Sequence, residues 1–404
     1  MITKSPVSKN GEAFFFKKRR HIVTKRGMMM AFITIKPEIK YNLALLAREL
    51  KIDETLLRSA NQTAQKHQLY CPGYKIEEST DKELQSIQEV KRFLHPLQLQ
   101  PADDWLEQEK IYDFLAAEEE IKKIINVFPF VSCREIGRSV LGRPIWELAV
   151  GGEHTSKKVH MNASFHANEW ITTSVLLKWL KEYCLSLCHN TNFFGFTPLE
   201  LFSRTSLSLV PLVNPDGVDL VLHGSAGMGD RRDELDRLNC HRPNFNEWKA
   251  NINGVDLNKQ FPSLWEIEKY RKPKTPSYRD FPGTSPLTEP ESIAMQQLIT
   301  ADPPDRLVAL HTQGEEIYWG YKGLEPEESA AVIKDFETIS GNIYKGVKDI
   351  DSYAGFRDWF IHHYFKEGYT VELGKGQNPL PFEQFSHIFQ ATSGILWRSL
   401  FFLE

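Results

Sequence analysis

The segment that most constrains this chain places a histidine and a glutamate three residues apart, directly before an apolar helix. His166 and Glu169 stand in Asn-Ala-Ser-Phe-His-Ala-Asn-Glu-Trp at 162–170, and residues 170–180 read as the helix. Side chains three apart on a helix, or on the turn that opens it, point the same way. One imidazole and one carboxylate can therefore reach one metal ion, and a catalytic zinc site needs a third protein ligand from elsewhere.

An apolar run ending in a histidine supplies the candidate third ligand. Residues 307–310, Leu-Val-Ala-Leu, read as a buried strand that carries His311 at its carboxyl end. Open α/β sheets place their ligands outside such strand ends. The strand-like run 369–373 contains Glu372, a carboxylate that is costly to bury unless it is paired or catalytic. Singly, each residue is as well explained by a core hydrogen bond or an ion pair, so the metal site is predicted from the whole set.

Five ordered motifs resemble the zinc carboxypeptidases of the carboxypeptidase A type, from about residue 111 to the C-terminus. The matches are His-x-x-Glu at 166–169, Asn-Pro-Asp-Gly at 214–217, Gly-Val-Asp-Leu-Asn at 254–258, His311 and Glu372. The resemblance implies an α/β fold with a mixed, mostly eight-stranded sheet flanked by helices. It also implies one Zn²⁺ held by His166, Glu169 and His311, with an open position for water.

The resemblance also implies roles for residues around the metal. Glu372 takes a proton from the attacking water and passes it to the leaving amine, as a base and then an acid. Asp256 hydrogen-bonds to His166 and fixes the tautomer of its imidazole. Lys249 follows Trp248 where the family has an arginine, and its ammonium is the candidate to stabilise the oxyanion. The alternative for Lys249 is an ordinary surface lysine.

Two positions depart from the family pattern on the substrate side. Lys259 follows Asn258, where the family carries the arginine that holds a C-terminal carboxylate, so strict carboxypeptidase action is not implied. Arg357 stands just before an Asp-Trp pair, the place of the residue that selects the leaving-side side chain. A cation there calls for an anion on the substrate, although Arg357 can instead pair with Asp358 or Glu367 at the surface. The residues assigned to substrate binding are Arg357, Asn258, Lys259 and Tyr353.

The N-terminal region differs in character from the rest of the chain. Residues 31–78 predict a short strand, two helices and a short strand, with Pro-Gly at 72–73 as a turn. This βααβ pattern resembles a LysM peptidoglycan-binding module without its usual Gly-Asp; the alternative is a small helical cap on the enzyme. We expect a linker at 79–105 and the catalytic domain at 106–404. Residues 1–30 are basic, and are expected to be disordered or to precede a true start at one of the three methionines that end them.

The combination of a LysM-like module, a zinc carboxypeptidase-like domain and a cation in the leaving-side pocket resembles the bacterial γ-D-glutamyl-L-diamino acid endopeptidases. That resemblance implies hydrolysis of the γ-D-glutamyl–meso-diaminopimelate bond in peptidoglycan stem peptides or muropeptides. Diaminopimelate keeps a carboxylate at its far end, with which Arg357 can pair. Two alternatives stay open: a metallocarboxypeptidase that removes acidic C-terminal residues, and a non-catalytic peptidoglycan-binding protein.

The composition argues against several other classes of protein. The net charge of −4 gives no case for nucleic-acid binding, and no apolar run reaches the ~18 residues of a membrane helix. The five cysteines are odd in number and scattered, which fits a reducing compartment. The basic stretch at 17–26 lacks the apolar segment of a signal peptide, so we expect a cytoplasmic enzyme, or one in a spore or forespore compartment. The sequence leaves the oligomeric state open.

Overall fold

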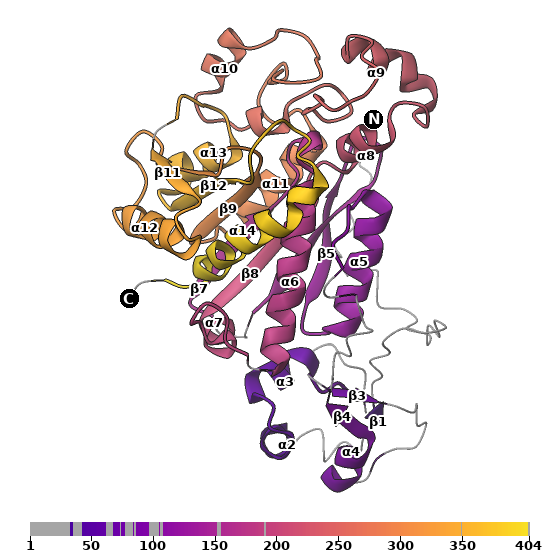
Figure 1. Cartoon of the computed structure of the whole chain (residues 1–404), viewed down its shortest axis with the longest axis vertical. Coiled ribbons are helices and arrows are strands. Elements are labelled where there is room, and N and C mark those ends of the chain that lie inside the picture. Colours follow the sequence, from indigo (N-terminus) through magenta and orange to yellow (C-terminus); the bar gives the residue numbers. More distant parts are fainter. Residues whose placement is uncertain are drawn as a thin grey trace, which may run out of the picture.

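An eight-stranded mixed sheet forms the centre of the larger part of the molecule (Figure 1). The computed structural model describes residues 33–34, 43–61, 68–72, 74–76, 84, 86–96, 105, 108–151, 155–189, 191–348 and 350–402. The strands are β5 (Ser132–Arg138), β6 (Pro144–Val150), β7 (Lys157–Asn162), β8 (Thr205–Val210), β9 (Arg306–His311), β10 (Glu316–Trp319), β11 (Lys345–Lys348) and β12 (Glu367–Glu372). Their order across the sheet is β11-β10-β12-β9-β7-β8-β6-β5. The expected mixed eight-stranded sheet is therefore confirmed.

The four central strands run parallel and end at one edge of the sheet. β8, β7, β9 and β12 are consecutive parallel neighbours. Glu372 of β12 lies opposite His311 of β9, and Asn162 of β7 lies opposite Ala309. This register brings the carboxyl ends of segments far apart in the sequence to one place, as the strand-end argument predicts.

Helices cover both faces of the sheet because its inner strands are apolar on both sides. On β9, Leu307 and Ala309 belong to one apolar cluster, while Val308 and Leu310 belong to another. Successive strand residues point to opposite faces, so this alternation requires a cover on each. The helices on the side of Val308 and Leu310 are α5 (Phe114–Val127), α6 (Ile171–His189), α7 (Pro198–Arg204), α12 (Ser329–Ile339) and α14 (Phe385–Ser399). The helices on the side of Leu307 and Ala309 are α11 (Pro290–Ala301) and α13 (Phe356–Tyr364).

Short helices and turns are concentrated at the carboxyl edge of the sheet. The helices are α8 (Pro215–His223), α9 (Arg232–Leu238) and α10 (Trp265–Arg271), and the 3-10 turns are η1 (Ala167–Glu169), η2 (Gly229–Arg231), η3 (Leu257–Lys259) and η4 (Phe382–Gln384). In Figure 1, α8, α9 and α10 lie at the top of the molecule. Among the described residues, no helix combines the length and apolar character needed to cross a bilayer, and the five cysteines form no disulfide.

The N-terminal region contains a small module of its own. Its elements are β1 (Ile33–Thr34), α2 (Leu43–Leu50), α3 (Glu54–Asn61), β2 (Gln68–Leu69), β3 (Tyr74–Ile76), α4 (Ile87–Phe93) and β4 (Leu94–Pro96). Two helices lie between β1 and the next strand, but β1 pairs antiparallel with β2, which precedes the turn predicted at 72–73. The strand expected after that turn, β3, pairs with β4 instead, and the LysM class stays a prediction. Leu84, Val90 and Leu94, within the segment expected to be a linker, pack in the module's apolar cluster. Part of that segment is therefore folded onto the module, because its apolar residues have a core to join.

The module is joined to the larger part of the molecule by buried contacts. Leu56, Ala60 and Tyr70 belong to the same apolar cluster as α5 and α6. The hydroxyl of Tyr70 donates to the carbonyl oxygen of Val127 at 2.6 Å. Within the module, Asn61 exchanges hydrogen bonds with the backbone of Tyr70 and so holds that residue in place. Figure 1 shows α2, α3 and α4 below α6, at the end away from α9 and α10. The predictions for residues 1–30 lie outside the described residues.

Candidate metal centre and active site

The loop from β7 to α6 presents the His-x-x-Glu pair, and its neighbours hold it in place. His166 precedes η1, and α6 begins at Ile171. The buried amide of Asn214, which caps α8, donates to the carbonyl oxygen of Phe165 at 3.2 Å. The backbone N–H of Ala167 donates to the carbonyl oxygen of Lys249 at 3.1 Å. The Asn-Pro-Asp-Gly turn therefore supports the segment that carries His166.

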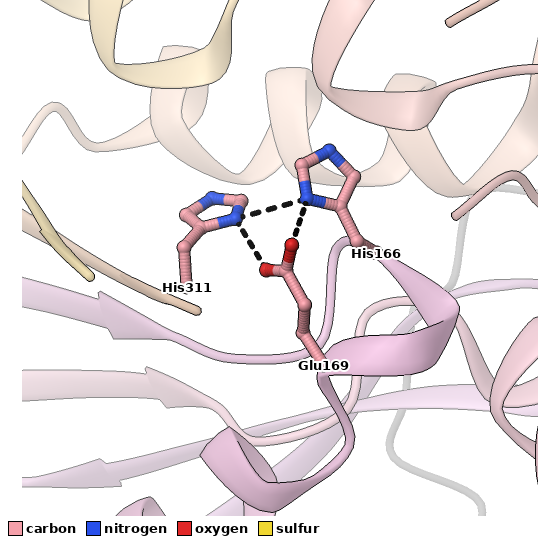
Figure 2. A group of neighbouring side chains, drawn as sticks. All are labelled: His166, Glu169 and His311. Atoms are coloured by element: carbon pink, nitrogen blue, oxygen red, sulfur yellow. Dashed lines mark hydrogen bonds and ion pairs between the residues drawn. The ribbon is translucent and has the colours of Figure 1, made fainter. Parts of the chain in front are cut away.

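His166, Glu169 and His311 converge in a buried group (Figure 2). The two oxygens of Glu169 lie 2.8 Å from Nδ1 of His166 and 2.9 Å from Nδ1 of His311, and the two Nδ1 atoms are 3.2 Å apart. In a tetrahedral zinc site with bonds of about 2.0–2.1 Å, the ligand atoms stand about 3.3 Å from one another. The donor set of two imidazoles and one carboxylate suits zinc, and its spacing fits a single ion of that size.

Asp256 lies behind His166, where the sequence predicts it. Its Oδ1 is 3.2 Å from Nε2 of His166 and also accepts from the backbone N–H of Asn258 at 3.0 Å. Burial lowers the pKa of His166, but Glu169 and Asp256 outweigh it and raise that pKa to about 9. Burial raises the pKa of Asp256, but His166 and Lys249 lower it well below its usual range. The imidazole is thus fixed through one nitrogen and presents the other to the metal group.

Glu372 and Lys249 lie at the open side of the metal group. Burial, together with the charge of Glu169, raises the pKa of Glu372 to about 8. The ammonium of Lys249 is 3.5 Å from Oε1 of Glu169, and its side chain is 20 % exposed. Burial lowers the pKa of Lys249, but the carboxylates of Glu169, Asp256 and Glu372 outweigh it and raise the pKa. A carboxylate that binds a proton readily and a cation that stays charged therefore face the same space.

That space is a cavity with a volume of about 230 Å³. Its walls include His166, Lys249, Asp256, Asn258, Lys259, Lys272, Asp280, His311, Tyr318, Ile350, Ser352, Gly355, Arg357, Asp358, Thr370 and Glu372. Tyr353, assigned to substrate binding from the sequence, does not line it. The Tyr353 ring instead lies 5.2 Å from the guanidinium of Arg271 and 4.6 Å from the ammonium of Lys322.

Arg357 lies in the cavity wall with part of its guanidinium unpaired. Only 4 % of the residue is exposed. Its Nε donates to Oδ1 of Asp358 at 3.1 Å, and Nη2 contacts the same oxygen. Nη1 is buried and has no hydrogen-bond partner among the described residues. Glu367 pairs with Arg306 instead, so within the described part of the chain the ion-pair partner of Arg357 is Asp358, and that pair is buried.

Lys259 and Asn258 line the cavity but are already engaged by the protein. The ammonium of Lys259 lies 2.9 Å from Oγ of Ser352 and 3.4 Å from both Oε1 of Glu268 and the carbonyl oxygen of Tyr353. The side-chain oxygen of Asn258 accepts from the backbone N–H of Phe356 at 2.9 Å. These contacts join η3 to the start of α13.

Sequence reasoning missed Tyr318 and Glu268. Tyr318 stands on β10, whose four residues, Glu-Ile-Tyr-Trp, do not alternate between polar and apolar and so give no strand signal. Glu268 lies in a polar stretch, but Trp265 and Glu268 are the buried residues of α10. Their spacing of three along a helix was the available signal that Glu268 points inward.

Comparison with known proteins gives consistent results. The family model described as zinc carboxypeptidase matches residues 117–393. The chain is 83 % identical over 376 residues to "Uncharacterized protein YqgT" of Bacillus subtilis (strain 168), covering 93 % of this chain and 100 % of that protein. It is 46 % identical over 290 residues to "Gamma-D-glutamyl-L-diamino acid endopeptidase 1" of Lysinibacillus sphaericus, covering 72 % of each. The crystal structure of thrombin activatable fibrinolysis inhibitor shares the fold, with a TM-score of 0.58 and 18 % identity over 74 % of this chain and 75 % of that one.

Proposed function

The chain belongs to the zinc carboxypeptidase family, and from that premise we propose that it hydrolyses the γ-D-glutamyl–meso-diaminopimelate bond of peptidoglycan stem peptides. As a member of the family it is a zinc metallopeptidase that uses one zinc ion. We assign His166, Glu169 and His311 as the ligands of that ion. The relative that is 46 % identical is named as a γ-D-glutamyl-L-diamino acid endopeptidase, which supports this choice of substrate.

The observation that carries the proposal is the unpaired Nη1 of Arg357 in the wall of the cavity that holds the metal group. A buried donor without a partner is costly unless a ligand supplies one. A carboxylate suits a guanidinium best, because the two form charge-assisted hydrogen bonds. Meso-diaminopimelate carries such a carboxylate at the far end of its side chain, where lysine has none. Arg357 therefore favours a diaminopimelate leaving group.

The residues around the cavity divide the chemistry among them. When bound, zinc polarises the scissile carbonyl and lowers the pKa of a water molecule toward about 7. Glu372 accepts the proton of the attacking water and then gives it to the departing amine. Lys249 places a positive charge where the oxyanion develops, and Asp256 holds His166 in orientation. The diaminopimelate then leaves with a free amine, while the glutamate keeps its γ-carboxylate.

Direct hydrolysis of a defined peptide tests the proposed function. Zinc-loaded protein incubated with L-Ala-γ-D-Glu-meso-diaminopimelate is expected to release L-Ala-D-Glu and free diaminopimelate, identified by mass spectrometry. A dansylated α-linked peptide ending in glutamate serves as the competing substrate. Trimming of that peptide without release of L-Ala-D-Glu would make the protein a metallocarboxypeptidase for acidic residues. Cleavage of neither peptide by zinc-loaded protein would contradict both activities.

Arg357→Ala is expected to lower kcat/KM for the diaminopimelate peptide by about 10- to 100-fold. That range corresponds to one hydrogen bond between charged groups, about 1.5–3 kcal/mol. The same peptide with lysine in place of diaminopimelate lacks the far carboxylate, so its kcat/KM is expected to change much less. Arg357→Lys keeps the cation, so its kcat/KM for the diaminopimelate peptide is expected to lie between those of the wild type and Arg357→Ala. Equal losses on both peptides would remove Arg357 from the role of selector.

A further inference from the structure

We infer that Glu268 is a specificity-determining residue. By neutralising the charge of Lys259, it lets the site accept substrates in which the α-carboxyl group of the leaving residue forms a peptide bond to a further residue. The inference rests on the proposed function and extends it to the length of the peptide. Lys259 stands where the family resemblance places the arginine that holds a C-terminal carboxylate. Whether Lys259 already has partners within the protein therefore bears directly on whether the substrate needs a free C-terminal carboxylate.

Glu268 is fully buried on α10 and points at the cluster around Lys259. Its Oε1 accepts from the backbone N–H of Tyr353 at 3.0 Å and from the ammonium of Lys259 at 3.4 Å. The Nε of Arg271 lies 3.8 Å from the same oxygen. The carboxylate thus holds the cation of Lys259 and the chain before α13 together.

The donors of Lys259 are all accounted for within the protein. An ammonium has three N–H donors and no acceptor. Oε1 of Glu268, Oγ of Ser352 and the carbonyl oxygen of Tyr353 provide three partners. The positive charge is also balanced by a carboxylate at close range. A substrate carboxylate reaching Lys259 would have to displace one of these partners, so the residue gives little advantage to a free C-terminus.

Arg357 differs from Lys259 in this respect. Its Nη1 has no partner among the described residues, although both side chains line the cavity. Of these two cations on the leaving side, only Arg357 therefore keeps a donor without a partner among the described residues. This matches a leaving residue whose far carboxylate is free and whose α-carboxyl is engaged in a further peptide bond.

Two substrates that differ only in that bond test the inference. In L-Ala-γ-D-Glu-meso-diaminopimelate the α-carboxylate next to the cleaved bond is free, and in the same peptide extended by D-Ala it is an amide. The wild type is expected to cleave both peptides, with kcat/KM values that differ by no more than about 3-fold. A hydrogen bond between a charged group of the site and the free α-carboxylate would instead make the two values differ by ~10-fold. Glu268→Gln removes the compensating charge, and is expected to raise the preference for the shorter peptide by about 10-fold.

Glu266→Gln is the matched control, because Glu266 lies on the same helix with 80 % of its side chain exposed. It is expected to leave the ratio between the two substrates unchanged. Lys259→Arg tests the same point without touching the buried carboxylate. Arginine has five N–H donors where lysine has three, so two donors would remain after the present partners are satisfied. These two could bind the free α-carboxylate, so this variant should also prefer the shorter peptide.

The outcomes separate the inference from the proposed function. A raised preference for the shorter peptide in Glu268→Gln supports the role of Glu268. If that variant does not fold, the same change in Lys259→Arg supports it. Cleavage of both peptides with the wild-type ratio in every folded variant overturns it. Cleavage of neither peptide by the zinc-loaded wild type overturns the proposed function, and the inference with it.

Discussion

Glu372→Gln is expected to lower kcat for the stem peptide by about 10²- to 10⁴-fold, the range for loss of a general acid–base group. The side-chain amide keeps the shape of the carboxylate but cannot take a proton from the attacking water. Because the proton transfer is needed only in the transition state, kcat and kcat/KM should fall by similar factors. Steady-state kinetics by chromatography of released L-Ala-D-Glu measures both.

The matched control for this variant is Glu316→Gln. Glu316 lies opposite Glu372 on the neighbouring strand β10 but does not line the cavity. Its replacement removes a carboxylate from the same part of the sheet and should leave kcat within a few-fold of wild type. Elemental analysis should find the same zinc content in both variants. A Glu372→Gln protein that contains zinc and retains most of its activity would exclude Glu372 as the base.

The residues around the metal could be predicted because local rules place them. The spacing of His166 and Glu169 fixes their common direction, and an apolar run that ends in His311 marks a strand end. Parallel strands bring their carboxyl ends to one edge, so the register of β9 and β12 follows from the fold. Asp256 required the family resemblance, since nothing local relates it to a histidine that is 90 residues away.

The pairing of side chains across the cavity could not be predicted in the same way. Lys259 meets Glu268 and Ser352 because η3, α10 and the chain before α13 pack together, and no periodicity specifies that packing. The substrate-binding role of Tyr353 stays a prediction; its ring lies near the cations of Arg271 and Lys322, contacts that the sequence gives no means to foresee. Sequence spacing gives the direction of a side chain along one element, whereas a contact between loops depends on the whole fold.

His311→Ala is expected to reduce bound zinc from about one ion per chain to a small fraction and to abolish hydrolysis. A catalytic zinc site needs three protein ligands, and the two remaining groups come from a single turn. Treatment of the wild type with a chelator should cause the same loss of activity. Added zinc should then restore activity to the wild type but not to His311→Ala. His387→Ala is the control, because that histidine is 61 % exposed and lies outside the metal group.

Loss of zinc should be separable from loss of the fold. Glu169 also accepts from the backbone N–H of Thr312 at 3.2 Å, and Asp256 holds the far nitrogen of His166, so hydrogen bonds keep the ligands in place without an ion. The metal then stabilises the protein only through its binding, by about 4 kcal/mol when free zinc is a thousand times its Kd. Thermal unfolding of the wild type should therefore shift upward with zinc concentration, while His311→Ala should show little shift. If the chelated wild type instead lost its circular dichroism signal at room temperature, the ion would be required for the fold itself. The buried histidines and the carboxylates of Glu169 and Asp256 would then be unable, without the ion, to hold the carboxyl edge of the sheet together.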